Sequence, residues 1–320
     1  MRALVTGISG FVGGHLTEHL LAQGWEVWGC SLHTEMAMKW RTLGVRFAAA
    51  DLTDANATRD ALLTAQPEVV FHLAAQAAVA PSHQHPWQTL QVNMAMQTHV
   101  LEAVRHHLPY CVVLVVGSGE EYGQASAQDM PLREEAPLRP VSPYAVSKLA
   151  QDFLGLQYHL AYGVRTVRVR PFNHIGPRQG LGFVAADFAK QLAEAEAGLR
   201  PPLIKVGNLS AERDFTDVRD VVRAYTLLVG QGKWGEVYNV ASGRAMAIGK
   251  LLELLLSRCC CQVEVVQDQE RMRPSDTPVF VGDYSRLHEA TGWQPEIPLE
   301  RTVADVMTYW RAQVRSERIG

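Results

Sequence analysis

The sequence predicts an α/β fold, a doubly wound parallel sheet of the Rossmann type with a smaller C-terminal lobe that interleaves with it. Two observations support this prediction. In the first half of the 320 residues, short apolar runs of strand type alternate with amphipathic helical stretches, which is typical of a parallel sheet covered on both faces. In addition, the first predicted strand runs directly into a glycine-rich turn that opens a helix.

Six strands are expected in this first half, each a short run rich in apolar residues. They cover residues 2–6, 26–30, 45–49, 68–73, 111–117 and 164–170. The helices expected between them have apolar residues at helical spacing and are long enough to be crossover connections. These helices cover residues 11–23, 54–65, 87–107 and 143–162.

The alternation becomes less regular after residue 172, where clusters of proline and glycine interrupt it. A helix is predicted over 183–197. A helix over 214–230 and a strand over 235–241 are able to return to the first sheet. The predicted division is 1–172 with 214–241 for the first domain, and 173–213 with 242–320 mainly for the second lobe.

Composition and charge exclude several classes of function. The formal net charge of −3 is spread evenly along the chain, so no basic face is available for a nucleic acid. The chain contains no uninterrupted apolar run of about 18 residues, the length that a membrane span requires. Its first apolar run is too short for a secretory signal, and we expect a cytoplasmic protein. The contiguous Cys259, Cys260 and Cys261 are interpreted as a helix end running into a strand, because no second Cys or His group lies at metal-ligand spacing; no metal is expected.

The glycine-rich turn reads Thr-Gly-Ile-Ser-Gly-Phe-Val-Gly over residues 6–13. Gly7 permits a tight turn, Gly10 lets the backbone approach a pyrophosphate at the helix N-terminus, and Gly13 allows the helix to pack closely on the strand. A plain strand-to-helix turn is the alternative, which the position after the first strand disfavours. We therefore expect a dinucleotide cofactor to bind at Gly7, Ser9, Gly10, Phe11, Val12 and Gly13.

The end of the second predicted strand bears on the choice between NAD and NADP. NAD-preferring folds place an acidic residue there to bond the adenosine ribose, but this chain continues with Ser31, Leu32 and His33. Without a carboxylate the site does not repel a 2′-phosphate. The sequence thus predicts NADP or NAD, with NADP favoured and Ser31 in contact. After the third strand, Asp51 and Leu52 are expected beside the adenine, although an acid at a helix N-terminus is the alternative for Asp51.

Tyr144 and Lys148 lie four residues apart in the helix predicted over 143–162, so they share one helix face about one turn apart. A nearby ammonium favours a phenolate, and we expect Lys148 to lower the pKa of Tyr144 so that Tyr144 exchanges a proton. This spacing also occurs by chance. Ser118 supports the catalytic interpretation, because it follows the fifth strand at the edge where a doubly wound sheet binds its ligands.

With the glycine turn, these three residues make the chain resemble the extended short-chain dehydrogenase/reductase family over nearly its whole length. Further matching runs are His72-Leu73-Ala74-Ala75-Gln76, Val92-Asn93, Arg170-Pro171-Phe172-Asn173 and Arg213-Asp214-Phe215-Thr216-Asp217-Val218-Arg219-Asp220. The resemblance implies a triad in which Ser118 orients a carbonyl, Tyr144 is the acid/base and Lys148 also bonds the nicotinamide ribose. It further implies a cofactor groove lined by Tyr144, Lys148, Leu73, Ala74, Ala75, Asn93 and Phe172.

Within this family, four runs are similar to the branch that handles GDP-sugars, which holds GDP-mannose 4,6-dehydratase and the reductase that forms GDP-D-rhamnose. These runs are residues 170–177, 183–189, 206–209 and 273–276. The resemblance implies that Arg213 and Arg273 grip the diphosphate and that Asp276 meets the ribose. Guanidinium forks suit oxyanions, and surface salt bridges are the alternative. The other substrate contacts expected are Gln76, Ser118, Glu120, Asn173 and Val184.

Two reactions remain open at this site, and both transfer hydride at C4 of the sugar. Dehydration also needs a base for the C5 proton and an acid to expel the C6 hydroxyl. Glu120 is the candidate base, but the adjacent position, an acid or hydroxyl in nucleotide-sugar dehydratases, is Gly119. We therefore expect reduction of GDP-4-dehydro-6-deoxy-D-mannose to GDP-D-rhamnose, with GDP-mannose 4,6-dehydratase or another dehydratase or epimerase as the alternative. A non-catalytic dinucleotide-binding protein is a remote alternative, since it has no need of the triad.

The resemblance also implies how the chain associates. In this family, the counterparts of the helices near 87–107 and 143–162 pair across a two-fold axis as a four-helix bundle. We expect a homodimer of this kind. No nucleic-acid partner and no membrane partner are expected.

Overall fold

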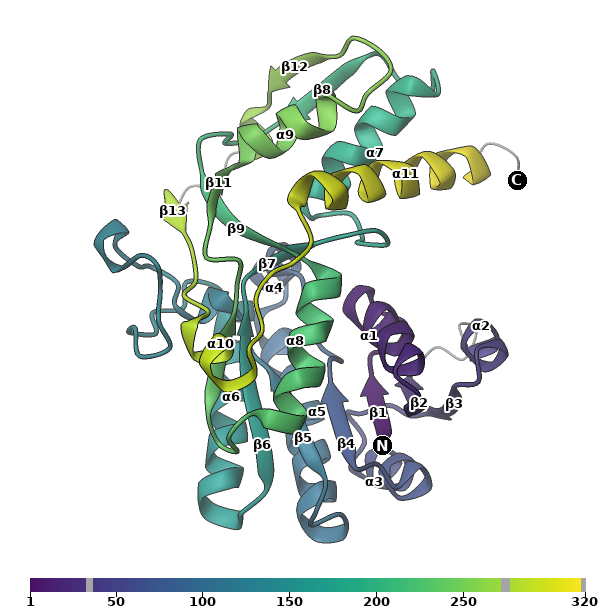
Figure 1. Cartoon of the computed structure of the whole chain (residues 1–320), viewed down its shortest axis with the longest axis vertical. Coiled ribbons are helices and arrows are strands. Elements are labelled where there is room, and N and C mark those ends of the chain that lie inside the picture. The colour runs from purple at the N-terminus through teal and green to yellow at the C-terminus, as the bar shows by residue number, and fades with distance from the viewer. Residues whose placement is uncertain (33–36, 272–276, 318–320) are drawn as a thin grey trace.

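The computed structural model describes residues 1–32, 37–271 and 277–317. Its centre is a seven-stranded sheet in the order β10-β6-β5-β4-β1-β2-β3, and all neighbouring strands are parallel (Figure 1). The strands are β1 (Arg2–Thr6), β2 (Glu26–Ser31), β3 (Arg46–Ala49), β4 (Val69–His72), β5 (Val112–Val116), β6 (Arg165–Pro171) and β10 (Val237–Val240). The strand order reverses between β1 and β4, and ligands of such sheets bind at the carboxyl ends near this reversal.

Helices cover both faces of this sheet, and an apolar core lies on each side. One face carries α3 (Ala55–Ala65), α5 (Pro86–His107) and α6 (Pro143–Tyr162), with α5 packed against both α3 and α6. The other face carries α1 (Phe11–Ala22), α8 (Val218–Gln231) and α10 (Ser285–Thr291), with α8 packed against both α1 and α10. Two short helices, α2 (Ala37–Thr42) and α4 (Val79–Gln84), lie in the connections. The doubly wound α/β fold is confirmed.

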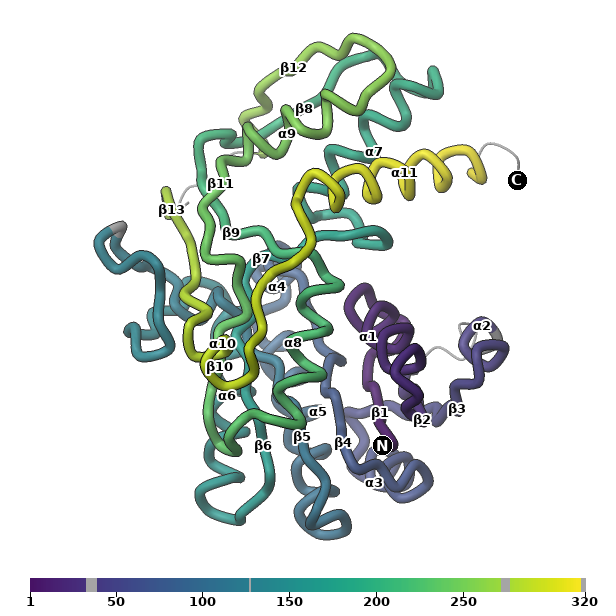
Figure 2. The backbone as a smooth tube through the Cα atoms, viewed as in Figure 1, coloured from purple at the N-terminus to yellow at the C-terminus, as the bar shows by residue number. Residues whose placement is uncertain are grey.

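A second group of elements lies beyond the carboxyl ends of β1, β4 and β5. Its core is formed by α7 (Val184–Glu196), α9 (Ile248–Leu256) and α11 (Leu299–Glu317), together with the paired strands β8 (Leu203–Val206) and β12 (Glu264–Gln267). A further small sheet contains β7 (Asn173–Ile175), β9 (Glu212–Asp217), β11 (Ala245–Ala247) and β13 (Val279–Phe280). The backbone trace passes between the two groups several times (Figure 2). The 3-10 turns are η2 (Gly119–Glu121), η3 (Ala127–Asp129) and η4 (Gln269–Arg271).

The structure corrects one predicted element. Residues 214–217, which we assigned to a helix over 214–230, are the end of strand β9, and the helix begins only at Val218. The side chain of Asp217 accepts a hydrogen bond from the N–H of Arg219 and so caps the helix after the strand. As predicted, β10 joins the first sheet beside β6, and α8 packs on β5 and β6. Helix α10, in the stretch assigned mainly to the second lobe, packs on α8 and β10.

Two further expectations concern local structure. Cys259, Cys260 and Cys261 lie between the end of α9 and the start of β12, as the sequence predicts. Across residues 1–32, 37–271 and 277–317, no helix combines the length and the apolar character needed to cross a membrane.

Candidate active site

The glycine turn lies between β1 and α1, at the carboxyl end of the sheet. Gly7 has a φ of 68°, a conformation that glycine adopts without strain. A Cβ atom on Gly13 would lie 2.2 Å from the carbonyl oxygen of Gly7, so only glycine lets α1 approach the turn this closely. Gly10, the N-cap of α1, is exposed, and the amides that follow it at Phe11 and Val12 have no carbonyl acceptor within a helix. The turn therefore fits a pyrophosphate.

The neighbouring strand ends supply polar groups beside this turn. The hydroxyls of Ser9 and Ser31 are 3.1 Å apart, which joins the turn to the end of β2. The carboxylate of Asp51 is exposed and accepts hydrogen bonds from the N–H and hydroxyl of Thr53 at 2.9 and 2.7 Å. These bonds hold the pKa of Asp51 below its usual value, so Asp51 is a ready hydrogen-bond acceptor. The side chain of Leu52 is buried in the core.

Ser118 and Tyr144 come from different elements and meet beyond the carboxyl end of β5. Ser118 is the N-cap of η2, and its hydroxyl accepts a hydrogen bond from the N–H of Glu120 at 3.1 Å. Tyr144 lies in the first turn of α6, and its N–H donates to the hydroxyl of Ser82 in α4 at 3.2 Å. The hydroxyl of Ser118 lies close enough to the phenol of Tyr144 to lower the pKa of that phenol. A substrate oxygen that reaches this pair meets two hydroxyl groups.

The protonation of Tyr144 is set chiefly by its surroundings. Burial raises the pKa of Tyr144 above its usual value, and the hydrogen bond from Ser118 opposes this increase. The nearby charges of Glu120 and Glu121 raise the pKa of Tyr144 further. Tyr144 is therefore a protonated phenol at neutral pH and is ready to donate a proton.

Lys148 lies one turn after Tyr144 on the same helix and is 5% exposed. Its Nζ donates to Oε1 of Gln151 at 2.9 Å. Burial lowers the pKa of Lys148 to about 8, although the carboxylates of Glu121 and Asp152 oppose the decrease. The structure thus departs from the expectation that Lys148 lowers the pKa of Tyr144, because the amine bonds Gln151 and burial of the phenol dominates.

The segment Leu73–Gln76, which includes Ala74 and Ala75, follows β4 beside the glycine turn. Two of its backbone N–H groups donate to the hydroxyl of Thr6, at 3.1 and 3.2 Å. Asn93 of α5 is fully buried; its Oδ1 accepts from the N–H of Gln76 at 2.7 Å, and its Nδ2 donates to the hydroxyl of Ser147 at 2.9 Å. Asn93, predicted to line the groove, therefore ties this segment to α6 with its amide.

Phe172 follows β6 and is 3% exposed. Its ring packs against Tyr122 and Phe280 in a small apolar cluster. A Cβ atom on Gly119 would lie 3.2 Å from this ring, so the position next to Glu120 has little room for a side chain. The ring of Phe172 therefore packs against η2 at Gly119.

Three of the predicted substrate residues, Asn173, Val184 and Arg213, lie on elements of the second group. Asn173, in β7, is exposed, and Val184, the first residue of α7, is half-buried. Arg213 lies in β9, and its guanidinium donates to two backbone carbonyls at 2.9 and 2.8 Å. Arg273 and Asp276 lie outside the described residues.

A buried group of charged side chains beneath Ser118 was not assigned from the sequence. Glu121 accepts a hydrogen bond from the N–H of Ser118, and Arg170 bonds both Glu121 and Asp152. Arg170 stands in a run that carries the family resemblance, Glu121 follows Ser118 by three residues, and Asp152 follows Lys148 by four residues. The spacing of Asp152 was the one available signal, since it places this carboxylate on the face of α6 that carries Tyr144 and Lys148.

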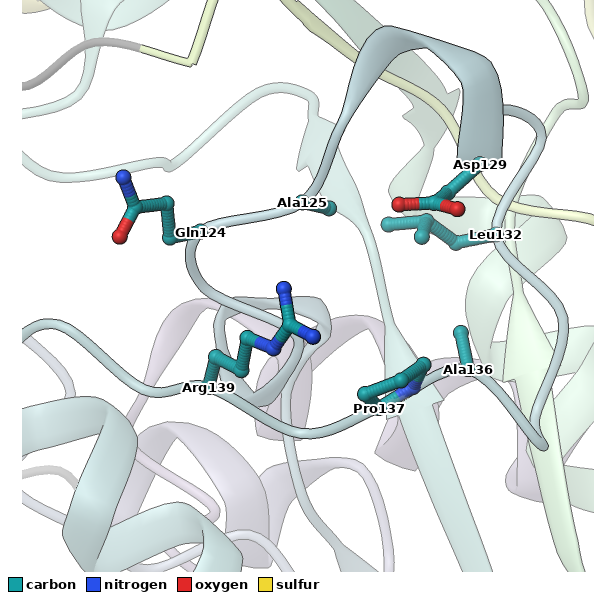
Figure 3. A pocket seen from close by; sticks show the side chains of 7 residues that line it. All are labelled: Gln124, Ala125, Asp129, Leu132, Ala136, Pro137 and Arg139. Atoms are coloured by element: carbon teal, nitrogen blue, oxygen red, sulfur yellow. The ribbon is translucent and has the colours of Figure 1, made fainter.

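A hollow in the loop between η2 and α6 is separate from this site (Figure 3). The residues that line it all belong to that loop: Gln124, Ala125, Asp129, Leu132, Ala136, Pro137 and Arg139. None of the predicted catalytic, cofactor or substrate residues is among them. The hollow is therefore not the candidate active site.

The parallel sheet, its glycine turn and the grouping of Ser118, Tyr144 and Lys148 define an extended short-chain dehydrogenase/reductase. The chain belongs to the GDP-mannose 4,6 dehydratase family, whose sequence model matches residues 4–306. This membership confirms the expectation of an NAD(P)-dependent oxidoreductase of the nucleotide-sugar type.

Individual relatives match nearly the full length of the chain. The GDP-6-deoxy-D-mannose reductase of Pseudomonas aeruginosa is 39% identical over 316 residues, which cover 99% of both chains. GDP-mannose 4,6 dehydratase 2 of Arabidopsis thaliana is 32% identical and covers 94% of this chain and 84% of its own length. A solved structure of RMD from Pseudomonas aeruginosa complexed with NADPH has a TM-score of 0.87 and 36% identity, and the match covers 98% of this chain and 100% of that one.

Proposed function

We propose that this chain reduces the C4 keto group of GDP-4-dehydro-6-deoxy-D-mannose with NADPH or NADH and forms GDP-D-rhamnose. The observation that carries the proposal is the placement of Ser118 beside the Tyr144 phenol, with Lys148 one turn further on, at the ligand-binding edge of the sheet. The 39% identity with a GDP-6-deoxy-D-mannose reductase over 99% of both chains supports the choice of substrate.

Each member of this group has a separate task. The hydroxyl of Ser118 holds the C4 oxygen of the sugar, and the buried Tyr144 phenol donates its proton to that oxygen as the carbonyl is reduced. A bound reduced nicotinamide supplies the hydride. The ammonium group of Lys148 is assigned to the nicotinamide ribose of the cofactor. Because burial lowers the pKa of Lys148 to about 8, this amine is protonated at neutral pH.

Cofactor binding is assigned to the glycine turn and the strand ends around it. The amides at the start of α1 hold the pyrophosphate, the segment Leu73–Gln76 flanks it, and Asp51 accepts the adenine amino group. Ser31 lies beside the ribose. NADPH is preferred in this proposal, because Ser31 carries no charge that would repel a 2′-phosphate, and the structural relative described above was solved with NADPH.

The GDP-sugar is assigned to a second set of residues. Arg213 and Arg273 bind the diphosphate and Asp276 binds the ribose, while Gln76, Asn173 and Val184 contact the remainder of the GDP-sugar. The proposed division of the chain follows from this assignment: 1–172 with 214–241 bind the cofactor, and 173–213 with 242–320 mainly bind the substrate.

Reduction is favoured over dehydration by the surroundings of Gly119. A dehydratase needs an acid next to the base that removes the C5 proton, and here a side chain at position 119 would meet the ring of Phe172 at 3.2 Å. Glu120 therefore stands beside a position that has no proton to donate. We assign Glu120 to contact with the sugar.

We further propose a homodimer formed through a four-helix bundle of α5 and α6. Val146, Phe153 and Leu160 of α6 are 41, 48 and 74% exposed, and Trp87 and Met94 of α5 are 72 and 40% exposed. In both helices these apolar residues are seven apart, which is the spacing of a helix-packing seam. Sedimentation that shows only monomer at micromolar concentration would contradict the proposal.

A cytoplasmic location is also part of the proposal. All five cysteines are free thiols, as expected for a protein of a reducing compartment. Cys30 and Cys111 are buried in the core. Activity recovered with the cytosolic fraction of the source cells would support this location, and activity found only outside the cytosol would contradict it.

The test of function supplies GDP-4-dehydro-6-deoxy-D-mannose with NADPH or NADH and follows loss of the reduced nicotinamide absorbance. A parallel reaction contains GDP-mannose without added cofactor, and NMR identifies the sugar products. We expect cofactor oxidation and GDP-D-rhamnose in the first reaction and no 4-keto product in the second. A 4-keto product from GDP-mannose would establish a dehydratase with Glu120 as a working base, and no turnover with any keto-sugar would favour a non-catalytic protein.

A further inference from the structure

Four charged side chains form a buried ionic cluster beneath the catalytic groups: Glu121 of η2, Asp152 of α6, and Arg168 and Arg170 of β6. Each is between 0 and 5% exposed. Asp152 accepts from Arg168 at 2.7 Å through one oxygen and from Arg170 at 2.9 and 2.7 Å through the other. Glu121 accepts from Nε of Arg170 at 3.0 Å. Burying charges is costly even when they are paired. A role other than stabilising the fold therefore accounts for the presence of this charged cluster in the core.

Arg170 connects the two elements that carry the catalytic hydroxyls. Through Glu121 it reaches η2, because the other carboxylate oxygen of Glu121 accepts the N–H of Ser118 at 2.7 Å and forms a capping box with it. Through Asp152 it reaches α6, in which Tyr144, Lys148 and Asp152 are spaced by four residues and share one face. The guanidinium group of Arg170 therefore links Glu121, which holds Ser118, to helix α6, which carries Tyr144.

The charge state of the cluster favours a hydrogen-bonding role for Glu121. Burial raises the pKa of Glu121 well above its usual value, and the neighbouring charge of Asp152 raises it further. A protonated Glu121 still accepts the N–H of Ser118, and a glutamine has nearly the same shape and hydrogen-bonding groups.

We propose that Glu121, Asp152 and Arg170 are positioning residues that hold Ser118 at the correct separation from Tyr144, with Glu121 acting through its hydrogen bonds. This inference rests on the proposed reductase function. It explains how the two hydroxyls keep a fixed separation although they belong to different elements, η2 and α6. A misplacement of about 1 Å at reacting groups costs on the order of 100-fold in rate.

The experiment compares Glu121→Leu, Asp152→Leu and the double variant in the keto-sugar assay. Each single variant is expected to lose on the order of 100-fold in kcat with the KM for the nicotinamide cofactor within about twofold. The double variant should be little worse than the poorer single variant, because both changes act through Arg170. Glu121→Gln should recover most of the activity lost in Glu121→Leu, and Asp152→Asn serves as a milder change should Asp152→Leu fail to fold.

Glu134→Leu is the matched control. Glu134 is also a buried carboxyl group, with a side chain 4% exposed, and it accepts the N–H of Asn239 rather than that of Ser118. We expect this variant to lose stability but to keep its kcat. A kcat loss equal to that of Glu121→Leu, or multiplied losses in the double variant, would overturn the proposal, since either indicates general destabilisation.

A second readout requires no substrate. The chain has nine tyrosines, so Tyr144 can be assigned in protein labelled at the tyrosine Cζ carbon by comparison with Tyr144→Phe. We expect Glu121→Leu to shift the Tyr144 signal, because the Ser118 hydroxyl beside the phenol is displaced, and we expect Glu134→Leu to leave the signal in place. An unchanged signal in Glu121→Leu would overturn the positioning role. Absent turnover in the wild-type protein together with a shifted signal would reject the reductase function alone.

Discussion

Replacing Lys148 with methionine should abolish turnover and at the same time stabilise the fold. Lys148 is 5% exposed, and burial lowers its pKa from 10.5 to about 8. At neutral pH the amine is charged in both the folded and the unfolded chain, so the shift corresponds to about 3 kcal/mol of unfavourable free energy in the folded state. The variant also loses the hydrogen bond to Gln151, which costs about 1 kcal/mol of stability. The expected gain for Lys148→Met is about 2 kcal/mol at pH 7.

The sign of the pH dependence follows from the direction of the shift. The folded-state pKa of Lys148 lies below its unfolded value, so its destabilising effect is complete below pH 8 and is removed as the pH rises toward 10.5. The advantage of Lys148→Met should therefore shrink by about 1 kcal/mol between pH 7 and pH 9. Burial raises the pKa of Tyr122, Tyr144 and Tyr225 above their usual value, so these tyrosines do not titrate between pH 7 and pH 9, and they are common to both proteins.

Urea unfolding of the wild type and Lys148→Met at pH 7 and pH 9 measures this difference, and thermal unfolding at pH 7 should show an increase of about 3 °C. Lys190→Met is a suitable control, because Lys190 is a half-buried partner of Glu194 on α7 and removing it should bring no such gain. The reasoning is refuted if Lys148→Met is no more stable than the wild type at pH 7, or if its advantage does not change between the two pH values.

Three other outcomes follow from the geometry. Tyr144→Phe should lower kcat by at least about 100-fold while the Kd for NADPH, measured by calorimetry, stays nearly unchanged; retained turnover would reject the proton-transfer role. Gly13→Ala should abolish cofactor binding or folding, because its Cβ would lie 2.2 Å from the Gly7 carbonyl, whereas Gly14→Ala in the same helix meets only ordinary contacts at 3.5 Å and should bind NADPH normally. Phe153→Glu, at a 48% exposed seam position, should convert a dimer to monomer in sedimentation without lowering the fraction folded, and a dimer that persists would place the interface elsewhere.

The first sheet was predictable because its signals are local. Each strand is a short apolar run between turn residues, and β1, β2, β4, β5 and β6 lie within one or two residues of their predicted ranges. The helix that follows β9 shows the limit of this approach. Residues 214–217 are all buried in β9, although three of the four are polar, and only the cap formed by Asp217 marks where the strand ends and the helix begins.

Residues whose partners are distant in sequence were harder to assign. Asn93 matches a groove position of the family, yet its amide is occupied by Gln76 and Ser147, which are 17 and 54 residues away. Glu121 stands next to the more conspicuous Glu120, and its contact with Arg170 spans 49 residues. No local pattern encodes such pairs, because they depend on how strands and helices are brought together by the whole fold.

This difference between local and distant signals has a consequence for how activity is encoded. The Tyr144 and Lys148 spacing is set by one helix, and any α6 of this sequence presents both side chains on one face. The hydroxyl of Ser118 comes from the N-cap of η2, so its distance from Tyr144 depends on the sheet, on the hydrogen bond that Ser82 accepts from the N–H of Tyr144 and on the buried cluster around Arg170. A chain that carries the Ser, Tyr and Lys residues without these supports would therefore retain the motif and still lack the geometry for proton transfer.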